Sequence, residues 1–379
     1  MEKRSLWRCG LLAAASCMTA CNRQATQAEN DGKLTLVVGS YASAADEGIR
    51  TFTFDQITGE CTALCGLRGI SNPSFLTVTD DGKRVYAVGE NNAEEATANL
   101  ILLDRQTGSL TLADTKHVHG ADPCHLAVSP DSTHLITANY SGGSITIFPL
   151  KADGEMDEGQ VVQFTGSGPD STRQECAHLH YVYFSPEGKW LMADDLGSDC
   201  IRMFPLAPQT ALGIDTSAAR EVKLAAGSGP RHAVFDHKGQ HLYVINELKG
   251  DVVVWEYANG ALKQTQSIQA DSVGARGSAD IHMSPDGQFL YASNRLQADG
   301  IAIFKVDAAS GQLTHIGYQN TAAHPRNFAI TPNGKFLLVA CRDADCIEIY
   351  ERDTDTGLLT DTGKRIEMPR PVVVQMVKQ

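Results

Sequence analysis

A repeated unit is the feature of this sequence that most constrains its fold. Each copy reads as an apolar segment, a turn such as SPDG and a second apolar segment, and further apolar segments follow before the next copy begins. The second residue of each copy marks the register, and these marks are Pro73, Pro123, Leu179, Pro230, Ser278, Pro325 and, in a partial copy, Pro369. Successive marks lie 44 to 56 residues apart, which is typical of the four-stranded blade of a β-propeller.

The apolar segments have the chemistry of β-strands. Segments such as KRVYAV, HLYVIN and FLYASN alternate or run apolar, and they are rich in β-branched and aromatic residues. The SPDG and TPNG segments between them are turn formers. Helical periodicity is absent after the N-terminal region, so the sequence predicts an all-β protein.

The two ends of the repeat predict a closed ring. Residues 34–40 and 49–55 match the second and third strands of a blade, but the first strand of that blade is missing there. The segment PVVVQMV at 371–377 supplies it. Pairing of the C-terminal strand with the N-terminal blade would leave no open sheet edge. We therefore predict a seven-bladed β-propeller over residues 33–379, with four antiparallel strands in each blade.

The N-terminal region reads as an export signal. A positively charged start precedes a short apolar stretch, and the run MTAC that ends at Cys21 is similar to a bacterial lipobox. We expect residues 1–20 to be a lipoprotein signal peptide, Cys21 to carry the lipid, and residues 21–32 to be the tether. The protein would then be an exported lipoprotein, anchored to a membrane in the periplasm or at the cell surface. The alternative is an ordinary cleaved signal with a cysteine there by chance.

Charge and cysteine content exclude some functions. The formal net charge of −13 and the absence of basic runs argue against nucleic acid as a partner. Seven cysteines follow the N-terminal region, and none has the CxxC spacing of a zinc or redox motif. We expect isolated buried thiols, no cofactor and a monomer. The alternative for the thiols is a disulfide, which an exported protein can form but which the sequence does not assign.

The register also predicts which side chains meet. The first strand of each blade lines the channel, and because neighbouring strands are antiparallel, its start lies at the same mouth as the end of the second strand. The residues that follow the marks form a first ring: Ser74, Cys124, His180, Arg231, Ala279, Arg326 and Arg370. The ends of the second strands form a second ring: Tyr41, Glu90, Tyr140, Leu196, Glu247, Arg295 and Arg342.

Histidines gather at the same register positions. Six of the twelve lie from one residue before a mark to four after it, namely His125, His178, His180, His232, His282 and His324. His178 and His180 could bind a metal together, with Asp194, Asp195 and Asp199 nearby in the chain, but spacing fixes no third ligand and we expect no metal. Charged channel linings can be structural, yet clustered charges in a partly dehydrated site are costly unless paired or used.

At these residues the sequence resembles the seven-bladed β-propeller lactonases, which include the propeller-type 6-phosphogluconolactonases and the carboxy-cis,cis-muconate cyclases. The motifs that carry the resemblance are HLH before FSPEG, then DLGSD, GPRH, INE, SADIHMSPDGQFLYASNR and HPRNF. The resemblance implies hydrolysis of a sugar lactone at the channel mouth. It also implies that His180, Arg231, Glu247 and Arg295 are catalytic, with Arg326 adjoining. The propeller-type 6-phosphogluconolactonases are usually cytoplasmic, whereas this chain reads as exported. The resemblance therefore supports lactone hydrolysis more strongly than it supports a phosphorylated substrate.

The residue types suggest separate roles in such a hydrolysis. His180 is the first choice as the general base that deprotonates water, and Glu247 is the second. Arg231 or Arg295 could stabilise the oxyanion, while Arg326 and Arg342 could hold a carboxylate or phosphate of the substrate. The remaining predicted substrate-binding residues are His178, His232, His282, Asn246 and Asn294.

Two other functions fit the same pattern. The basic mouth could bind an anionic sugar or peptide without turnover, as a non-catalytic periplasmic or surface protein. A scaffold that uses the outer faces of the ring is a third hypothesis, but it leaves the convergent charges unexplained.

Overall fold

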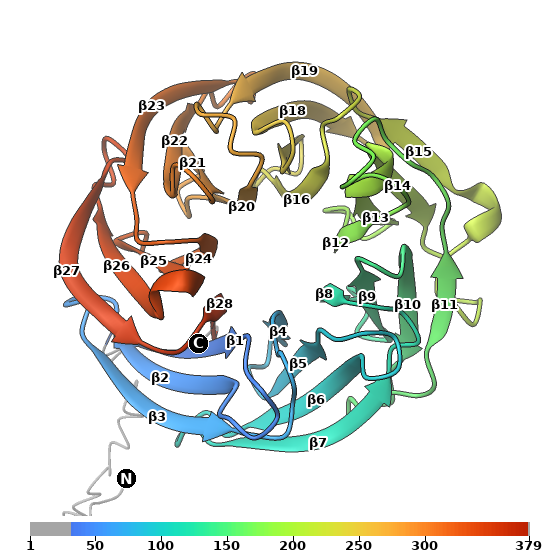
Figure 1. Cartoon of the computed structure of the whole chain (residues 1–379), viewed down its shortest axis with the longest axis horizontal. Helices are drawn as coiled ribbons and strands as arrows, with labels where there is room; N and C mark the ends of the chain where they lie inside the picture. Colours follow the sequence, from blue (N-terminus) through green and yellow to red (C-terminus); the bar gives the residue numbers. More distant parts are fainter. Residues whose placement is uncertain (1–31, 378–379) are drawn as a thin grey trace, which may run out of the picture. The chain divides into compact units, whose positions relative to one another are not determined.

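The computed structural model describes residues 32–377, and these residues form seven four-stranded sheets around a channel (Figure 1). All seven sheets are antiparallel blades, so the predicted all-β, seven-bladed propeller is confirmed. The predicted signal peptide, Cys21 and the tether up to residue 31 lie outside the described residues. Within 32–377, no helix has the length and apolar character needed to cross a membrane.

Six blades are continuous in the chain. Their strands in the first three are β4 (Leu76–Val78), β5 (Arg84–Gly89), β6 (Thr97–Leu103), β7 (Leu110–His117), β8 (Pro123–Val128), β9 (His134–Asn139), β10 (Ser144–Pro149), β11 (Gln160–Gln163), β12 (Leu179–Phe184), β13 (Trp190–Asp195), β14 (Cys200–Pro205) and β15 (Arg220–Lys223). The next three contain β16 (Pro230–Phe235), β17 (His241–Asn246), β18 (Asp251–Ala258), β19 (Ala261–Gln269), β20 (Ser278–Met283), β21 (Phe289–Asn294), β22 (Gly300–Val306), β23 (Leu313–Asn320), β24 (Pro325–Ile330), β25 (Phe336–Cys341), β26 (Cys346–Arg352) and β27 (Leu359–Glu367). Three short 3-10 helices lie in loops: η1 (Leu196–Ser198), η2 (Thr216–Ala218) and η3 (Arg342–Ala344).

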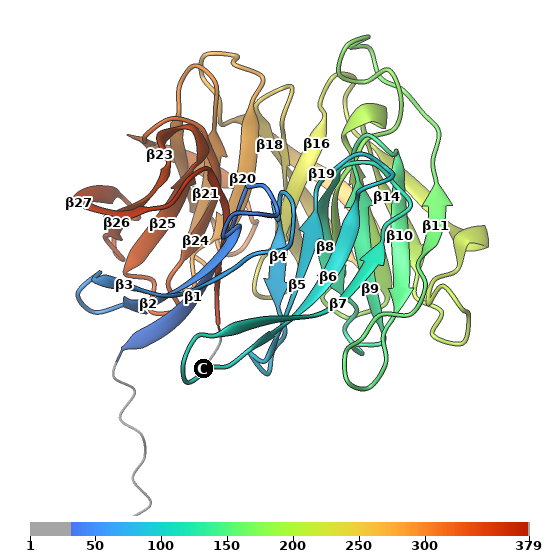
Figure 2. The same cartoon turned by 60° about the horizontal axis from the view of Figure 1, so that its bottom comes forward.

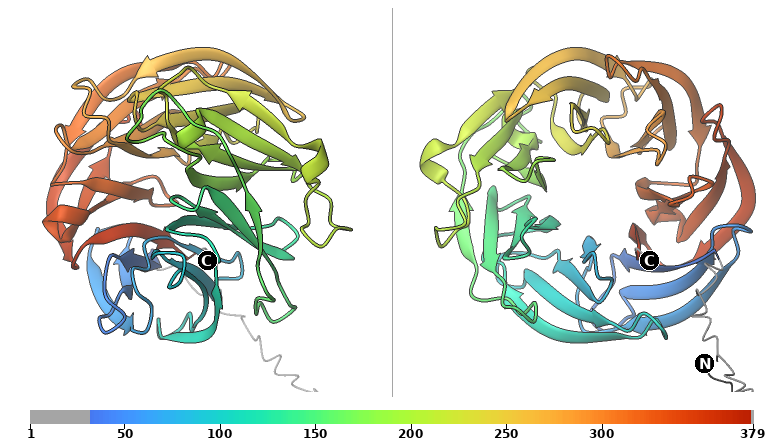
Figure 3. Two further views of the ribbon diagram at one scale, coloured as in Figure 1. Left: turned by 45° about the vertical axis from the view of Figure 1, so that its right-hand side comes forward. Right: turned by 180° about the vertical axis from the view of Figure 1, so that it is seen from behind.

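The seventh blade joins the two ends of the described chain. Its strand order is β28-β1-β2-β3, with β1 (Lys33–Ser40), β2 (Ile49–Asp55), β3 (Cys61–Leu67) and β28 (Pro371–Met376). The C-terminal strand pairs antiparallel with β1, and Val374 lies opposite Val38. Both Figure 1 and the rear view in Figure 3 place the C-terminus beside the blue N-terminal blade. The predicted closure of the ring is therefore confirmed.

The core lies between neighbouring blades. Every residue of β17, β21 and β25 is buried, whereas the outermost strand β19 is mostly exposed. Tyr243 and Ile245 of β17 pack in one cluster with Leu290 and Ala292 of β21, which belongs to the next blade. Because each blade is covered on both faces, its inner strands read as nearly continuous apolar runs. Figure 2 shows that the strands of the blades run between two faces, where the loops lie.

β-Bulges at the starts of the innermost strands position the first ring of side chains. The pairing register shifts between Pro123 and His125, Leu179 and Tyr181, Pro230 and His232, Ser278 and Ile281, and Pro325 and Asn327. The extra residues include Cys124, His180, Arg231, Ala279 and Arg326, which are the predicted first ring. A bulge interrupts the alternation of side chains and re-aims the extra residue. The same local feature thus recurs around one mouth of the channel.

Candidate active site

A buried carboxylate, Glu247, lies at the centre of an arginine cluster at this mouth. It follows the end of β17, and its Oε2 accepts a hydrogen bond from Arg231 Nε at 2.8 Å and forms an ion pair with Arg295 Nη2 at 3.2 Å. Its Oε1 accepts from Arg173 Nη2 at 2.6 Å. Glu247, Arg231 and Arg295 were predicted to converge, and the structure brings all three into contact.

The arginines keep Glu247 ionised. Burial alone would raise the pKa of Glu247, but the positive charges of Arg295, Arg231 and Arg173 outweigh burial and lower the pKa to about 2. Burial lowers the pKa of Arg295 to about 9, with the carboxylate of Glu247 opposing that change, so Arg295 is a cation at neutral pH. The cluster is therefore a charged network with more positive than negative groups.

Backbone carbonyls fix the orientation of two arginines. Arg231 Nη1 donates to the carbonyl oxygen of Ala279 at 2.7 Å, and this carbonyl belongs to the neighbouring blade. Arg295 Nε donates to Gly277 O at 2.8 Å. Arg231 and Arg295 are 1% and 5% exposed. Their guanidinium groups are held in place before any ligand binds, which is the arrangement that stabilises developing charge best.

His180 is buried beside these arginines with one ring nitrogen free. Its Nδ1 has no hydrogen-bond partner among the described residues. The imidazole lines a small cavity together with Ser74, Cys124, Arg231 and Arg326. Burial, with the charges of Arg231 and its neighbours, holds the pKa of His180 well below its usual range. The side chain is therefore a neutral imidazole with a lone pair or an N–H available to a bound molecule.

Arg326 is the cation of the cavity that has no carboxylate partner. No ion pair involving Arg326 occurs within residues 32–377, and its guanidinium carbon lies 5.5 Å from the centre of the Tyr41 ring. The Tyr41 hydroxyl contacts both carboxylate oxygens of Glu90 at 2.9 Å. Tyr41 and Glu90 both belong to the predicted second ring. Arg326 is thus steadied by an aromatic face while its donors stay available.

A layer of aromatic and polar side chains lies between this cavity and a second one. His125 packs between Phe75 and Tyr181, with ring centres 4.0 Å from each. His232 Nδ1 lies 2.7 Å from Asp280 Oδ1, and Asn327 Nδ2 donates to Asp280 Oδ2 at 2.5 Å. We call these residues, Phe75, His125, Tyr181, His232, Asp280 and Asn327, the plug. They separate the mouth from the other end of the channel.

Two predicted substrate-binding histidines belong to the plug or lie behind it. His232 lines the cavity, but its Nδ1 is taken by Asp280. Burial lowers the pKa of His232 to about 4. His282 Nε2 lies 2.9 Å from the other oxygen of Asp280, and its ring packs edge-on against Phe328. His282 therefore supports the plug and does not line the cavity.

Arg342 reaches the cluster through another histidine. Its Nη2 lies 3.2 Å from His324 Nδ1, and Arg295 Nη1 lies 3.4 Å from His324 Nε2. Arg342 is also paired with the exposed Asp343 at 2.7 Å. The arginine predicted to hold an anion thus lies at the outer edge of the mouth, one side chain away from the buried cluster.

The structure does not bring Asn246 and Asn294 to the cavity. Asn246 Nδ2 donates to Asp251 Oδ1 at 2.7 Å within its own blade. Asn294 Nδ2 donates to Ala270 O at 2.9 Å, and its Oδ1 accepts from the Ser278 hydroxyl. Each asparagine directly precedes a residue of the mouth in the sequence. Because successive side chains of a strand point to opposite faces, the asparagine side chain points into the blade. Both hold the loops that support the mouth.

His178 also turns away from the cavity. Its ring stacks on that of Tyr140 with centres 4.5 Å apart, and its Nδ1 lies 3.0 Å from Tyr140 O. The bulge at His180 breaks the alternation that would have placed the two histidines side by side. The metal pair considered from the sequence, His178 with His180, is therefore not formed in this arrangement.

The three aspartates considered beside those histidines have other partners. Asp195 accepts from His178 N at 2.9 Å and forms an ion pair with Arg202 at 2.8 Å. Asp199 accepts from backbone N–H groups that follow β15. Asp194 is fully buried, and its Oδ2 has no partner among the described residues. Desolvation raises the pKa of Asp194 to about 8.

This raised pKa predicts that replacing Asp194 with Asn stabilises the fold at high pH. The pKa of Asp194 is higher in the folded than in the unfolded state. Its contribution to the free energy of unfolding is therefore fully present below about pH 4 and falls as the pH rises toward 8. The variant should gain up to about 5 kcal/mol over the parent at pH 8, and the gain should vanish near pH 4. Thermal unfolding at several pH values measures the difference. Asp195→Asn is the control, because loss of its ion pair with Arg202 should destabilise the fold at both pH 4 and pH 8.

Sequence reasoning missed Arg173 and Asp280 as site residues. Arg173 lies in the loop between β11 and β12, outside the repeat, so the register could not indicate it. The only signal was length, because the spacing from Pro123 to Leu179, 56 residues, is the longest in the chain. Asp280 follows a first-ring residue, as His125 and His232 do, and the repeat could have indicated it.

A larger cavity lies on the other side of the plug. Its volume is about 1020 Å³, and it is lined by Phe75, His125 and Tyr181 of the plug and by turns that include Asp81 and Asp131. The cluster formed by Glu247 and its arginines is not part of it. The two cavities therefore differ in their lining, and only the smaller one is lined by His180, Arg231 and Arg326.

Comparisons with known proteins agree with this fold. A family model described as "Lactonase, 7-bladed beta-propeller" matches residues 35–376. A 6-phosphogluconolactonase of Formosa agariphila is 37% identical over 346 residues, which cover 89% of this chain and 96% of the relative. A crystal structure from Bacteroides fragilis, described as a candidate 6-phosphogluconolactonase, is 48% identical with a TM-score of 0.89, over 92% of this chain and 99% of that one.

A structure from Pseudomonas aeruginosa, described as a periplasmic gluconolactonase, is 31% identical with a TM-score of 0.86 and covers 91% of this chain and 99% of that one. The family model alone spans nearly the whole ring, from β1 to β28. Fold, mouth and relatives lead to one conclusion: this chain belongs to the seven-bladed β-propeller lactonase family.

Proposed function

We propose that this protein is a hydrolase that opens sugar lactones by attack of water at the mouth that holds Glu247. Membership of the lactonase family supports this reaction, and so do the names of its relatives, which are a 6-phosphogluconolactonase and a periplasmic gluconolactonase. The observation that carries the proposal is the small cavity where a neutral, partly unpartnered His180 lies beside Arg231 and Arg326. A base and cations in one cavity are what ester hydrolysis requires.

His180 is the general base in this mechanism. Water that attacks the lactone carbonyl must lose a proton, and His180 Nδ1 has no partner within residues 32–377 that competes for that proton. Glu247 is less suited to the role, because both of its oxygens already accept hydrogen bonds from arginines. Glu247 instead acts as a positioning residue for the arginines.

Arg231 stabilises the oxyanion of the tetrahedral intermediate. It lines the same cavity as His180, whereas the Arg295 side chain lies behind Glu247. Glu247 and Ala279 O occupy Arg231 Nε and Nη1, and further N–H groups of the guanidinium are left for a ligand. A lactone is an activated internal ester, so no covalent intermediate with a serine is needed.

Arg326 is the residue that holds a negative group on the substrate. It combines a positive charge, a half-buried position beside Tyr41 and the absence of a carboxylate partner within residues 32–377. A planar guanidinium can bind a carboxylate or phosphate through two parallel hydrogen bonds. Arg342, at the outer edge, would add to the attraction. A non-catalytic binder of anionic sugars would use the same arginines but would leave His180 without a role.

The test is a pH-stat screen of sugar lactones with and without a phosphate group. We expect release of one acid equivalent per lactone opened, faster than spontaneous hydrolysis. Replacing Arg326 with Met should raise KM for phosphorylated lactones at least about tenfold and change KM for neutral lactones much less, because only the former lose a charge-assisted contact.

Arg365→Met serves as the matched control, because Arg365 is paired with Asp361 on the outer strand β27 and should leave both KM values unchanged. Tight binding of the lactones by calorimetry without any acid release would contradict the hydrolase assignment and favour the binding function.

We also propose that the protein is an exported lipoprotein, attached to a membrane through Cys21. The sequence of residues 1–21 supports this location, and the Pseudomonas aeruginosa relative is described as periplasmic. The catalytic groups all come from one ring, so a monomer would be sufficient for activity.

A further inference from the structure

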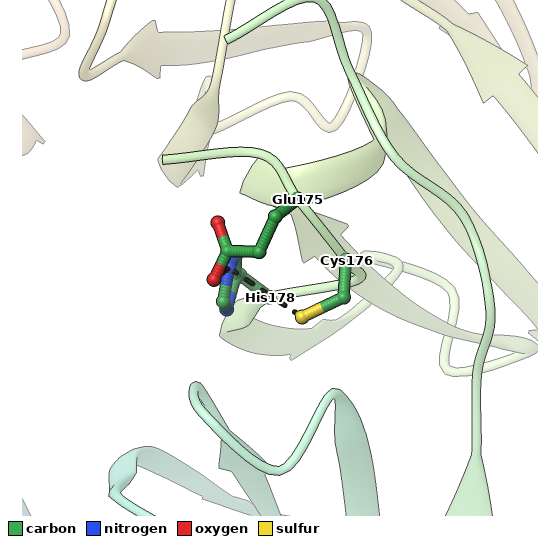
Figure 4. A group of neighbouring side chains, drawn as sticks. All are labelled: Glu175, Cys176 and His178. Carbon is green, nitrogen blue, oxygen red and sulfur yellow. Dashed lines mark hydrogen bonds and ion pairs between the residues drawn. The ribbon is translucent and has the colours of Figure 1, made fainter. Parts of the chain in front are cut away.

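Three side chains of different chemistry meet at the rim of the mouth, just before β12. They are Glu175, Cys176 and His178 (Figure 4), and their ligand atoms all lie within 4.8 Å of one another. His178 Nε2 lies 3.3 Å from Glu175 Oε1 and 3.7 Å from Cys176 Sγ. The lactonase mechanism uses none of these three residues.

The separations match the edges of a tetrahedral zinc site. Bonds from Zn²⁺ to imidazole nitrogen, carboxylate oxygen and thiolate sulfur are about 2.0–2.3 Å long. With tetrahedral angles, such bonds place nitrogen and oxygen about 3.4 Å apart, and nitrogen and sulfur about 3.6 Å apart. The observed 3.3 and 3.7 Å differ from these values by about 0.1 Å. The third separation, between the Glu175 carboxylate and Cys176 Sγ, is within 4.8 Å, so these two exposed side chains would adjust around the fixed His178 as the ion binds.

The second nitrogen of His178 has the partner that a ligating histidine needs. Nδ1 lies 3.0 Å from the carbonyl oxygen of Tyr140, which can only accept a hydrogen bond. Nδ1 therefore carries the hydrogen in the neutral ring, and Nε2 presents its lone pair to Glu175 and Cys176. A metal-bound histidine typically donates its other N–H to a carbonyl or carboxylate. The stacked ring of Tyr140 keeps the imidazole in this orientation.

The exposure of the three ligands suits a site that a cation reaches from solvent. Glu175 and Cys176 are exposed, whereas His178 is buried and fixed. The nearby Asp195 is committed to backbone N–H groups and Arg202, so it does not compete for the cation. One nitrogen, one oxygen and one sulfur ligand suit a borderline-soft ion, and three protein ligands leave one tetrahedral position for water.

We propose that Glu175, Cys176 and His178 bind one Zn²⁺ ion. Binding would replace the thiol proton of Cys176, which leaves to solvent, by a bond from sulfur to zinc. The ion would join the start of β12 to the end of the loop that carries Arg173. Because Arg173 contacts Glu247 in the mouth, zinc would order a loop that borders the active site.

The experiment uses reduced, tag-free protein freed of metal by a chelator. We expect calorimetry to show one Zn²⁺ bound per chain with Kd below about 10 µM, and Co²⁺ to give the near-ultraviolet absorption band of a thiolate–cobalt bond. Cys176→Ser should abolish that band, and Glu175→Gln should weaken zinc binding at least about tenfold. Both replaced side chains are exposed, so the fold should be retained.

His119→Ala is the matched control. His119 lies 2.8 Å from Glu158 at the surface, which gives a histidine–carboxylate pair without a thiol. This variant should bind zinc like the parent. Unchanged zinc affinity in Cys176→Ser, an absent thiolate–cobalt band in the parent, or no zinc binding below about 100 µM would each overturn the proposal. The readouts do not depend on lactonase activity.

Discussion

Replacement of His180 with Ala is expected to lower kcat for lactone hydrolysis by at least about 100-fold, which is the low end of the contribution of a positioned general base. The fold should hardly change, because His180 Nδ1 makes no hydrogen bond within the described residues. The expected combination is therefore a large loss of turnover with a small change in Tm. Steady-state kinetics and thermal unfolding of the same preparation measure both.

His241→Ala is the matched control for this variant. His241 is also buried, but its Nδ1 lies 2.8 Å from Asp236 at the turn between β16 and β17, at the far end of its blade. Loss of that imidazole should lower Tm and leave kcat unchanged. If His180→Ala keeps the turnover of the parent, His180 is not the base.

Replacement of Glu247 with Gln should affect stability and activity together. Removing one partner of a buried ion pair leaves uncompensated charge and costs about 3–5 kcal/mol. Here three arginines lose their shared carboxylate, so the variant should have a lower Tm and kcat/KM reduced at least about tenfold. Phosphate or sulfate should restore part of the lost Tm, because an anion can enter among the arginines.

Asp286→Asn is the control that separates loss of the Glu247 contacts from the general cost of breaking a buried ion pair. Asp286 pairs with the buried Arg352 at 2.6 Å, between the turn after β20 and the end of β26, away from the mouth. This variant should lower Tm without a change in kcat/KM. Equal activity of Glu247→Gln and the parent would remove Glu247 from the site.

The repeat explains why the fold and half of the site could be predicted. Copies in register place equivalent residues at equivalent points of a ring, so Glu247, Arg231 and Arg295 could be brought together without knowledge of any distance. The ring closure followed from the same reasoning, because the first blade lacks a strand that only residues 371–377 can supply. In a repeat protein, the position of a residue within its own copy is enough to predict which residues of other copies lie near it.

What departs from the repeat could not be predicted in this way. Arg173 lies in an insertion, and an insertion has no equivalent in other blades to indicate where its side chain points. The bulge at His180 also escaped prediction, because a bulge is a property of strand pairing and not of composition. Ideal alternation placed His178 beside His180 and suggested a mouth position for Asn246. The actual pairing turns His178 toward Glu175 and Asn246 toward Asp251.

The pairing of β28 with β1 determines when this protein can finish folding. During synthesis, β1 emerges early and waits with one edge unpaired until the strand that completes its blade has left the ribosome. The ring therefore cannot close before β28 has been made, and a contact between segments far apart in the chain forms late. In a circular permutant that begins at β28, this strand pair would form early instead, because its two strands would follow one another along the chain.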